Sequence, residues 1–374
     1  MNKILVLLAA FFAITAARPS LEQLDTYTFE QFIKEYNLSF KEDELPQRRA
    51  LFQSEIQRIK AHNARNSSWK EGVNKFTVMT AAEKKAFFGH SKALGRSQKK
   101  SLKSARKLPD DFVLQPVDAL PKHVDWREAG IVGPVKDQGH CGSCWAFAST
   151  ATIESHVAKA SGYLYDLSIQ QIASCTPNPN SCGGTGGCQG ATSELAFDYV
   201  SNSAGLFQEY QYSYQSYYAQ DYACTIPSGK PVAAIDGYVQ LPANNYTALL
   251  NAVARVGPVA IAVDASNWHS YESGIFNGCN QVNPDINHGV VLVGYGEEKG
   301  QKYWIVRNSW SPTFGERGFI RVARSDSDDS NCGSDITPQD GIACAGDNTP
   351  ETVCGTCGVI FDSSYPLNAK SIAH

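Results

Sequence analysis

The segment Gln138-Gly139-His140-Cys141-Gly142-Ser143-Cys144-Trp145 carries the most specific pattern in the 374-residue chain. A helical run predicted from residue 143 to about residue 159 puts Cys144 in its first turn. A thiol attacks only as the thiolate, and a helix N-terminus with a nearby imidazolium lowers the thiol pKa. The segment therefore predicts a nucleophilic Cys144. A redox pair or half of a metal site would use the same Cys-x-x-Cys spacing, but no βαβ pattern and no second ligand pair accompany it.

A base for this thiol must come from eight histidines. His288 opens an apolar run, residues 289–295, that predicts a strand. A single histidine in this position is more commonly structural. The next predicted strand, however, ends in Asn308-Ser309-Trp310, where an amide can orient an imidazole and an indole can shield their hydrogen bond from water. The pattern therefore predicts a nucleophile, a base and an orienting residue.

Other motifs occur in the same order as in one known family: Asp125-Trp126-Arg127, Asn287-His288-Gly289, Gly315-Glu316-Arg317-Gly318, and Cys357-Gly358 followed by Tyr365-Pro366. Over almost its whole length the chain resembles precursors of papain-family cysteine proteases of the cathepsin L type. This resemblance implies an α+β fold of two subdomains, the left one helical and the right one an antiparallel, barrel-like sheet, preceded by an α-helical propeptide. It also implies a monomer that hydrolyses peptide bonds through an acyl-enzyme, needs no cofactor or metal, and is open to cystatin-type inhibitors.

The resemblance also implies roles for single residues. Gln138 would donate its side-chain amide to the oxyanion, together with the backbone N–H of Cys144. Asp362 would form the floor of the pocket for P2, the second residue before the scissile bond, and a carboxylate there would favour Arg. The alternative is that Asp362 points into solvent. The remaining substrate-binding positions are Gly190, Ala191 (where relatives have a second Gly), Thr192, Ala262, Ile286, Asn287 and Trp310.

Eleven cysteines leave at least one unpaired, which agrees with a reactive thiol in an oxidising compartment. The resemblance implies the disulfides Cys141–Cys188, Cys175–Cys224 and Cys279–Cys357. Cys182, Cys332, Cys344 and Cys354 then remain, with three possible pairings. Three of these four lie in a long insertion, residues 325–356. Its Asp326-Ser327-Asp328-Asp329 run lacks the glycine and the closing glutamate of a calcium-binding loop and favours a solvated acidic loop.

The chain divides into three predicted parts. Residues 1–17 are typical of a signal peptide, and their eleven-residue apolar stretch is well short of the ~20 residues that span a bilayer. Residues 18–119 form the expected propeptide, ending in a basic linker over 91–119. The mature peptidase would cover 120–374, mainly helical over about 120–232 and mainly β over about 233–360. Its destination would be the secretory pathway, and then a lysosome, vacuole or phagosome, or the cell exterior.

The expected propeptide has an inhibitory-helix pattern of the same family in Glu44, Arg48, Phe52, Ile59 and Asn63, although Glu55 replaces a usual Asn and Val78 replaces the Asp of a second motif. Residues 1–119 hold 20 Lys/Arg and 13 Asp/Glu, a net charge of +7. Residues 120–374 hold 13 and 24, a net charge of −11, which makes nucleic acid an unsuitable partner. Attraction between the two parts would weaken as carboxylates are protonated near pH ~4. Alternatively, the basic residues only solvate the linker.

The sequence thus predicts an acid-activated cysteine endopeptidase that acts on proteins and peptides. Endopeptidase activity is favoured because no occluding insertion is evident near residues 175–200. A catalytically inactive papain-like binding protein and a disulfide-rich structural glycoprotein are the other two classes. Reaction of Cys144 with a papain-directed epoxide would separate the enzyme from both.

Overall fold

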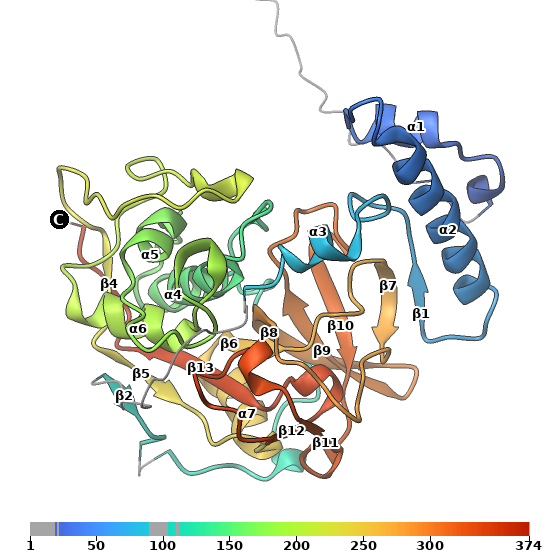
Figure 1. The fold of residues 1–374 in the computed structure, drawn as a ribbon. Coiled ribbons are helices and arrows are strands. Elements are labelled where there is room, and N and C mark those ends of the chain that lie inside the picture. The colour runs from blue at the N-terminus through green and yellow to red at the C-terminus, as the bar shows by residue number, and fades with distance from the viewer. Residues whose placement is uncertain (1–18, 21, 90–103, 110–111, 374) are drawn as a thin grey trace, which may run out of the picture.

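A computed structural model describes residues 19–20, 22–89, 104–109 and 112–373. The expected signal peptide and most of the basic linker lie outside these residues. Within them, helices gather on one side of the molecule and a large sheet on the other, with a separate helical N-terminal segment beyond the sheet (Figure 1). Within the described residues, no helix has the length and apolar character needed to cross a membrane.

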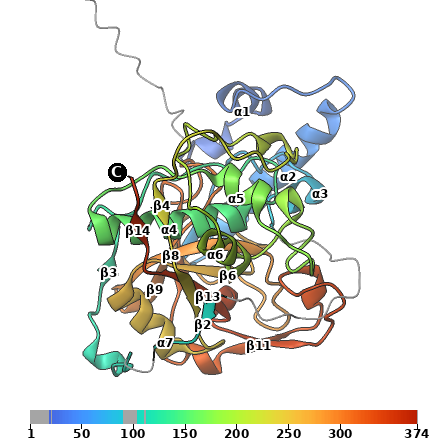
Figure 2. The same ribbon diagram turned by 90° about the vertical axis from the view of Figure 1, so that its left-hand side faces the viewer.

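The helical half is built around one buried helix. Its helices are α4 (Cys144–Ser161), α5 (Ile169–Cys175) and α6 (Ser193–Asn202). Every residue of α4 from Cys144 to Ala158 is buried, and the helix ends at Gly162, whose φ of 79° is the left-handed conformation that glycine adopts without strain. In the view of Figure 2, α4 runs across β8 of the sheet. Gly289 of β8 allows this close approach, because a Cβ there would lie 3.1 Å from the Trp145 Cα.

The other half is a mainly antiparallel sheet of ten strands in the order β1-β7-β10-β9-β8-β6-β13-β5-β2, with β3 paired to β8. Its strands from the second half of the chain are β5 (Gly237–Gln240), β6 (Val259–Val263), β7 (Tyr271–Phe276), β8 (His288–Glu298), β9 (Gln301–Arg307), β10 (Phe319–Ala323) and β13 (Asp362–Leu367). The earlier strands are β1 (Trp69–Glu71), β2 (Ala105–Arg106) and β3 (Val124–Asp125). The helix α7 (Tyr246–Asn251) belongs to this part, whereas the short pair of β4 (Ala233–Ala234) with β14 (Lys370–Ser371) packs against α4 of the helical half. The alternation of apolar strands with turns accounts for the sheet.

The N-terminal segment contains α1 (Phe29–Glu35), α2 (Leu45–Asn63) and α3 (Ala81–Lys85). Phe52, Ile56 and Ile59 share the buried face of α2, as their helical spacing predicts. Arg48 donates two hydrogen bonds of 2.6 Å to the Glu83 carboxylate and so ties α2 to α3. Val78, at the position where relatives have an aspartate, is buried in one apolar cluster with Phe52, Ile56 and Ile59.

Two short strands from the first 119 residues join the large sheet. β1 pairs with β7, and β2 pairs with β5 in parallel. β2 comes from the linker, in which the sequence gives no sign of structure, because two residues are too few to show a pattern.

The insertion forms a hairpin-like pair of strands, β11 (Cys332–Asp335) and β12 (Glu351–Cys354), closed by the disulfide Cys332–Cys354. The other two cysteines form Cys182–Cys344, which selects one of the three possible pairings. Asp326 bonds to Lys302, and Asp328 accepts from the Ser325 N–H and hydroxyl at 3.1 and 3.0 Å. Asp328 is buried, so the expectation of a solvated loop is wrong at this residue, and both aspartates serve the protein's own contacts.

Candidate active site

Cys144 lies where α4 begins, packed against the first residues of β8. Its Sγ accepts a hydrogen bond of 3.2 Å from the Gly289 N–H. His288, next to Gly289, starts β8 and is fully buried. The close packing of α4 on β8 therefore brings the thiol and the imidazole together from distant parts of the chain.

Asn308 follows β9, and its Oδ1 lies 2.8 Å from His288 Nε2. The same oxygen accepts from the Ser309 N–H at 2.8 Å, which fixes the orientation of the amide. Because Oδ1 can only accept, Nε2 carries the proton of the neutral imidazole and Nδ1 carries the lone pair. Trp310 covers this pair, with its ring centre 4.7 Å from that of His288.

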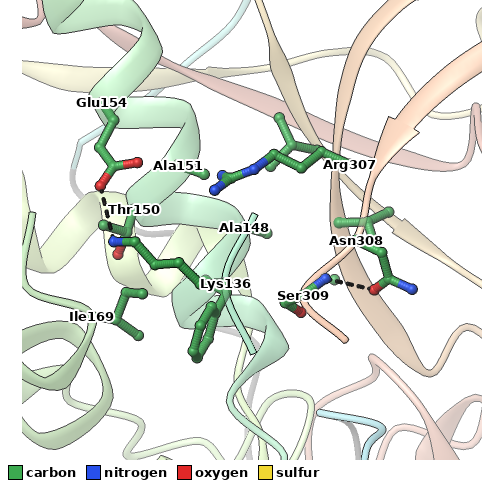
Figure 3. Close-up of a pocket in the computed structure, with 13 residues that line it drawn as sticks. Lys136, Ala148, Thr150, Ala151, Glu154, Ile169, Arg307, Asn308 and Ser309 are labelled. Atoms are coloured by element: carbon green, nitrogen blue, oxygen red, sulfur yellow. Dashed lines mark hydrogen bonds and ion pairs between the residues drawn. The ribbon is translucent and has the colours of Figure 1, made fainter. Parts of the chain in front are cut away.

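A small cavity lies between α4 and the loop after β9 (Figure 3). Lys136 forms an ion pair of 3.3 Å with Glu154 on its α4 side. Arg307, Asn308 and Ser309 line its opposite side.

The Gln138 amide is held on both sides. Its Oε1 accepts from the Ser309 hydroxyl at 2.7 Å, and its Nε2 donates to the carbonyl oxygens of Cys141 and Phe87, each at 2.9 Å. Phe87 belongs to the N-terminal segment. Its carbonyl oxygen therefore accepts a hydrogen bond from the Gln138 side-chain amide that is expected to donate to the oxyanion.

The N-terminal segment also covers the Cys144 thiol. A Cβ on Gly89 would lie only 2.2 Å from Cys144 Sγ. Phe88 packs its ring against His288, Trp310 and the buried ring of His269. Burial raises the pKa of the Cys144 thiol to about 11, although N–H groups of Gly289 and Gly89 favour the thiolate. In the precursor, burial therefore favours the protonated thiol over the thiolate.

Sequence reasoning missed His269, which it treated as a loop residue. Its ring stacks on Trp310 at 5.0 Å, and burial lowers the pKa of His269 to about 3, so that it is neutral. No sequence signal separates it from the chain's other histidines.

The expected substrate-binding residues lie on both sides of a pocket near the nucleophile. Thr192, Ala262 and Asp362 line it, together with Trp145 and Ile342. Asp362 is half-buried and accepts a hydrogen bond of 3.3 Å from Gln240. Ile342 comes from the insertion and was not predicted.

The other expected positions lie around this pocket. Ile286 is fully buried in the apolar cluster that contains Ala262. The Asn287 side chain bonds to the Ala265 N–H and the Ser266 hydroxyl. Gly190, at a φ of 96°, packs against Gly89, and the methyl of its neighbour Ala191 is fully buried.

The structure contains the disulfides Cys141–Cys188, Cys175–Cys224 and Cys279–Cys357. All eleven cysteines are among the described residues, and Cys144 alone of them is free. Among the described residues, one group has ligand atoms close enough to hold a metal ion: His123, Asp125 and Glu128. Arg127 already donates three hydrogen bonds to the Asp125 carboxylate, so this group forms a surface ion-pair cluster.

A buried thiol, an imidazole and an amide, covered by an N-terminal segment of the same chain, define the class of cysteine peptidase precursors. Residues 120–340 match the papain family cysteine proteases, and residues 29–83 match the cathepsin propeptide inhibitor domain (I29). The chain belongs to the papain family of cysteine proteases. The expectations about family, fold class and enzyme class are confirmed, and the N-terminal segment is a propeptide.

Named relatives agree with this assignment. The chain is 34% identical over 316 residues to pro-cathepsin H of Bos taurus, covering 83% of this chain and 89% of that one. It is 35% identical over 342 residues to a cathepsin L-like peptidase of Aedes aegypti, covering 88% and 97%. Among solved structures, digestive procathepsin L2 from the larval midgut of Tenebrio molitor superposes with a TM-score of 0.73 at 32% identity, covering 91% and 98%.

Proposed function

We propose that the mature chain is a cysteine endopeptidase in which Cys144 is the nucleophile, His288 the base and Asn308 the orienting residue. The observation that carries this proposal is the pair of contacts that joins Asn308 to His288 and the neighbouring Gly289 to Cys144. The proposed enzyme is a monomer of the secretory pathway that acts on peptides and proteins and is open to cystatin-type inhibitors.

The reaction follows from these positions. His288 Nδ1 takes the thiol proton, and Cys144 Sγ attacks the carbonyl carbon of the scissile bond. The oxyanion accepts hydrogen bonds from Gln138 Nε2 and the backbone N–H of Cys144. Imidazolium then protonates the leaving amine. Water, deprotonated by His288, attacks the thioester and restores the thiol. Since Phe87 and Gly89 occupy these positions in the precursor, the propeptide must leave first.

We also propose that acid releases the propeptide. Among the described residues, the ion pair that crosses from propeptide to mature enzyme is Lys75 with Asp137, at 2.7 Å. Burial lowers the pKa of Lys75, whereas the Asp137 carboxylate raises it, so the charged form of Lys75 is stabilised by Asp137. As acid reduces the negative charge of the acidic body, the attraction that holds the basic propeptide weakens.

Purified precursor should process itself faster at pH 4.5 than at pH 7.5 in low salt, and a papain-directed epoxide should then label Cys144 alone. Lys75→Met, which removes the buried cation without altering the mature enzyme, should raise the pH at which processing begins. Lys85→Met, at an exposed position of α3, should not. Equal rates at both pH values would refute the electrostatic part, and absence of the label would refute the nucleophile.

Asp362→Ala should reduce cleavage after Arg-Arg by roughly 1–3 kcal/mol in kcat/KM, the range for a lost charge-assisted contact. The reason is that Asp362 places a carboxylate in a pocket whose other walls are mostly apolar. Cleavage after Phe-Arg should change little. Dipeptidyl coumarin substrates measure both rates. Asp329→Ala makes the same charge change at an exposed position. Equal losses on both substrates would show that Asp362 does not recognise P2.

A further inference from the structure

One short segment of the insertion crosses between the two halves of the enzyme; we call residues 341–345 the strap. On the sheet side, Gly341 packs directly on Ile286, since a Cβ on Gly341 would lie 2.4 Å from the Ile286 carbonyl oxygen. On the helical side, Cys344 is disulfide-bonded to Cys182. Two residues separate these two anchors.

Backbone hydrogen bonds fasten the helical end of the strap. The Ala343 carbonyl accepts from the Gly183 N–H at 3.1 Å, and the Ala345 N–H donates to the carbonyl of Ser181 at 3.2 Å. The loop that receives the strap adjoins Gly190, because a Cβ on Gly190 would lie 2.3 Å from the Gly183 carbonyl oxygen.

The strap lies immediately beyond the P2 pocket. Ile342 lines that pocket together with Thr192 and Asp362. The family resemblance implies that a bound peptide runs from Cys144 along Gly190 and Ala191 and places its P2 side chain in the pocket. An extended chain advances about 3.4 Å per residue. The next residue, P3, therefore reaches the strap.

We propose that the strap ends the substrate cleft after P2, so that the enzyme hydrolyses peptides with two residues before the scissile bond much faster than longer ones. Ile342 closes the outer side of the P2 pocket, and Cys182–Cys344 holds the strap in place. Cleavage of internal bonds is then the slower reaction, because the chain before P2 must pass outside the strap. This proposal rests on the proposed peptidase activity and narrows it: removal of two residues from a free amino end becomes the faster reaction, and endopeptidase cleavage of internal bonds becomes the slower one.

The test compares Phe-Arg-aminomethylcoumarin, with a free amino group, and Ala-Ala-Phe-Arg-aminomethylcoumarin on the acid-processed enzyme, with active sites titrated by the epoxide. The dipeptidyl substrate should have the higher kcat/KM by at least about tenfold, the scale of forcing one residue into occupied space. The double variant Cys182→Ser/Cys344→Ser releases the strap. The longer substrate should then be cleaved faster, so that its kcat/KM approaches that of the dipeptidyl substrate.

Two further variants separate the strap from general damage. Cys332→Ser/Cys354→Ser removes the disulfide that stays within the insertion and should keep the preference. Ile342→Ala retains the bridge and should also keep it, while changing the choice of P2 side chain. Equal kcat/KM for the two substrates in the unaltered enzyme would overturn the strap proposal alone. Loss of hydrolysis on both substrates despite full processing would overturn the proposed function as well.

Discussion

Cys144→Ser and Cys144→Ala should abolish peptide hydrolysis, with kcat lower by at least about a thousandfold. The reason is geometric, since Cys144 is the one free thiol among the described cysteines and the N–H of Gly289, the neighbour of His288, donates a hydrogen bond to this sulfur. His288→Ala in the mature enzyme should cost nearly as much, because members of such a group act as one unit. Asn308→Ala should be milder, since Asn308 orients the imidazole and transfers no proton. Initial rates on Phe-Arg-aminomethylcoumarin measure all three.

The matched control is His123→Ala, which removes an exposed histidine outside the site and should leave kcat unchanged. Circular dichroism of each variant should show an unchanged fold, because the replaced side chains carry little of the core. Near-normal turnover by the Cys144 variants would disprove the mechanism.

In the unprocessed precursor, iodoacetamide should alkylate Cys144 at pH 7 at least about tenfold more slowly than an ordinary exposed thiol, because burial raises the pKa of Cys144 and Gly89 lies against its sulfur. Gly89→Val should remove much of this protection. Its Cβ would lie 2.2 Å from Cys144 Sγ and 2.9 Å from the Gly142 carbonyl oxygen, so the propeptide must move away from the cleft. Because overpacking costs roughly 1–3 kcal/mol, alkylation of the variant precursor should be about tenfold faster or more.

Ala82→Val adds side-chain volume at an exposed position of α3 and serves as the control for Gly89→Val. Mass spectrometry of intact precursor gives the alkylation rate and detects any processing during the assay. The idea that the propeptide path silences the thiol fails if wild-type precursor reacts as fast as free cysteine. It also fails if Gly89→Val and Ala82→Val react at the same slow rate.

Elements with a strong local pattern could be predicted from the sequence. β6 occupies residues 259–263, as its continuous apolar run indicates, and α4 begins at Cys144, where glycine and serine precede an apolar run. The contact between His288 and Asn308 was also expected, because each residue lies at one end of a predicted strand. In these cases the pattern of neighbouring residues is enough to predict the local structure.

The contacts of the insertion could not be predicted in this way, because they join residues that are far apart in the sequence. Nothing local relates Cys182 to Cys344, which are 162 residues apart, and three pairings fitted the sequence equally well. The absence of an insertion near residues 175–200 favoured an open cleft. The segment that reaches this region comes instead from residues 341–345. Ile342 and His269 went unnoticed for the same reason, since their surroundings exist only after the two halves have packed.

The propeptide supplies the strand at each end of the large sheet, β1 beside β7 and β2 beside β5. Its removal therefore leaves a sheet with two newly unpaired edges. Such edges are templates on which other extended chains can assemble. Activation thus converts a blocked enzyme whose sheet edges are paired into an active enzyme that can aggregate through the exposed edges. The lifetime of the mature protein should depend on how crowded its compartment is with unfolded chains, many of which are its own substrates.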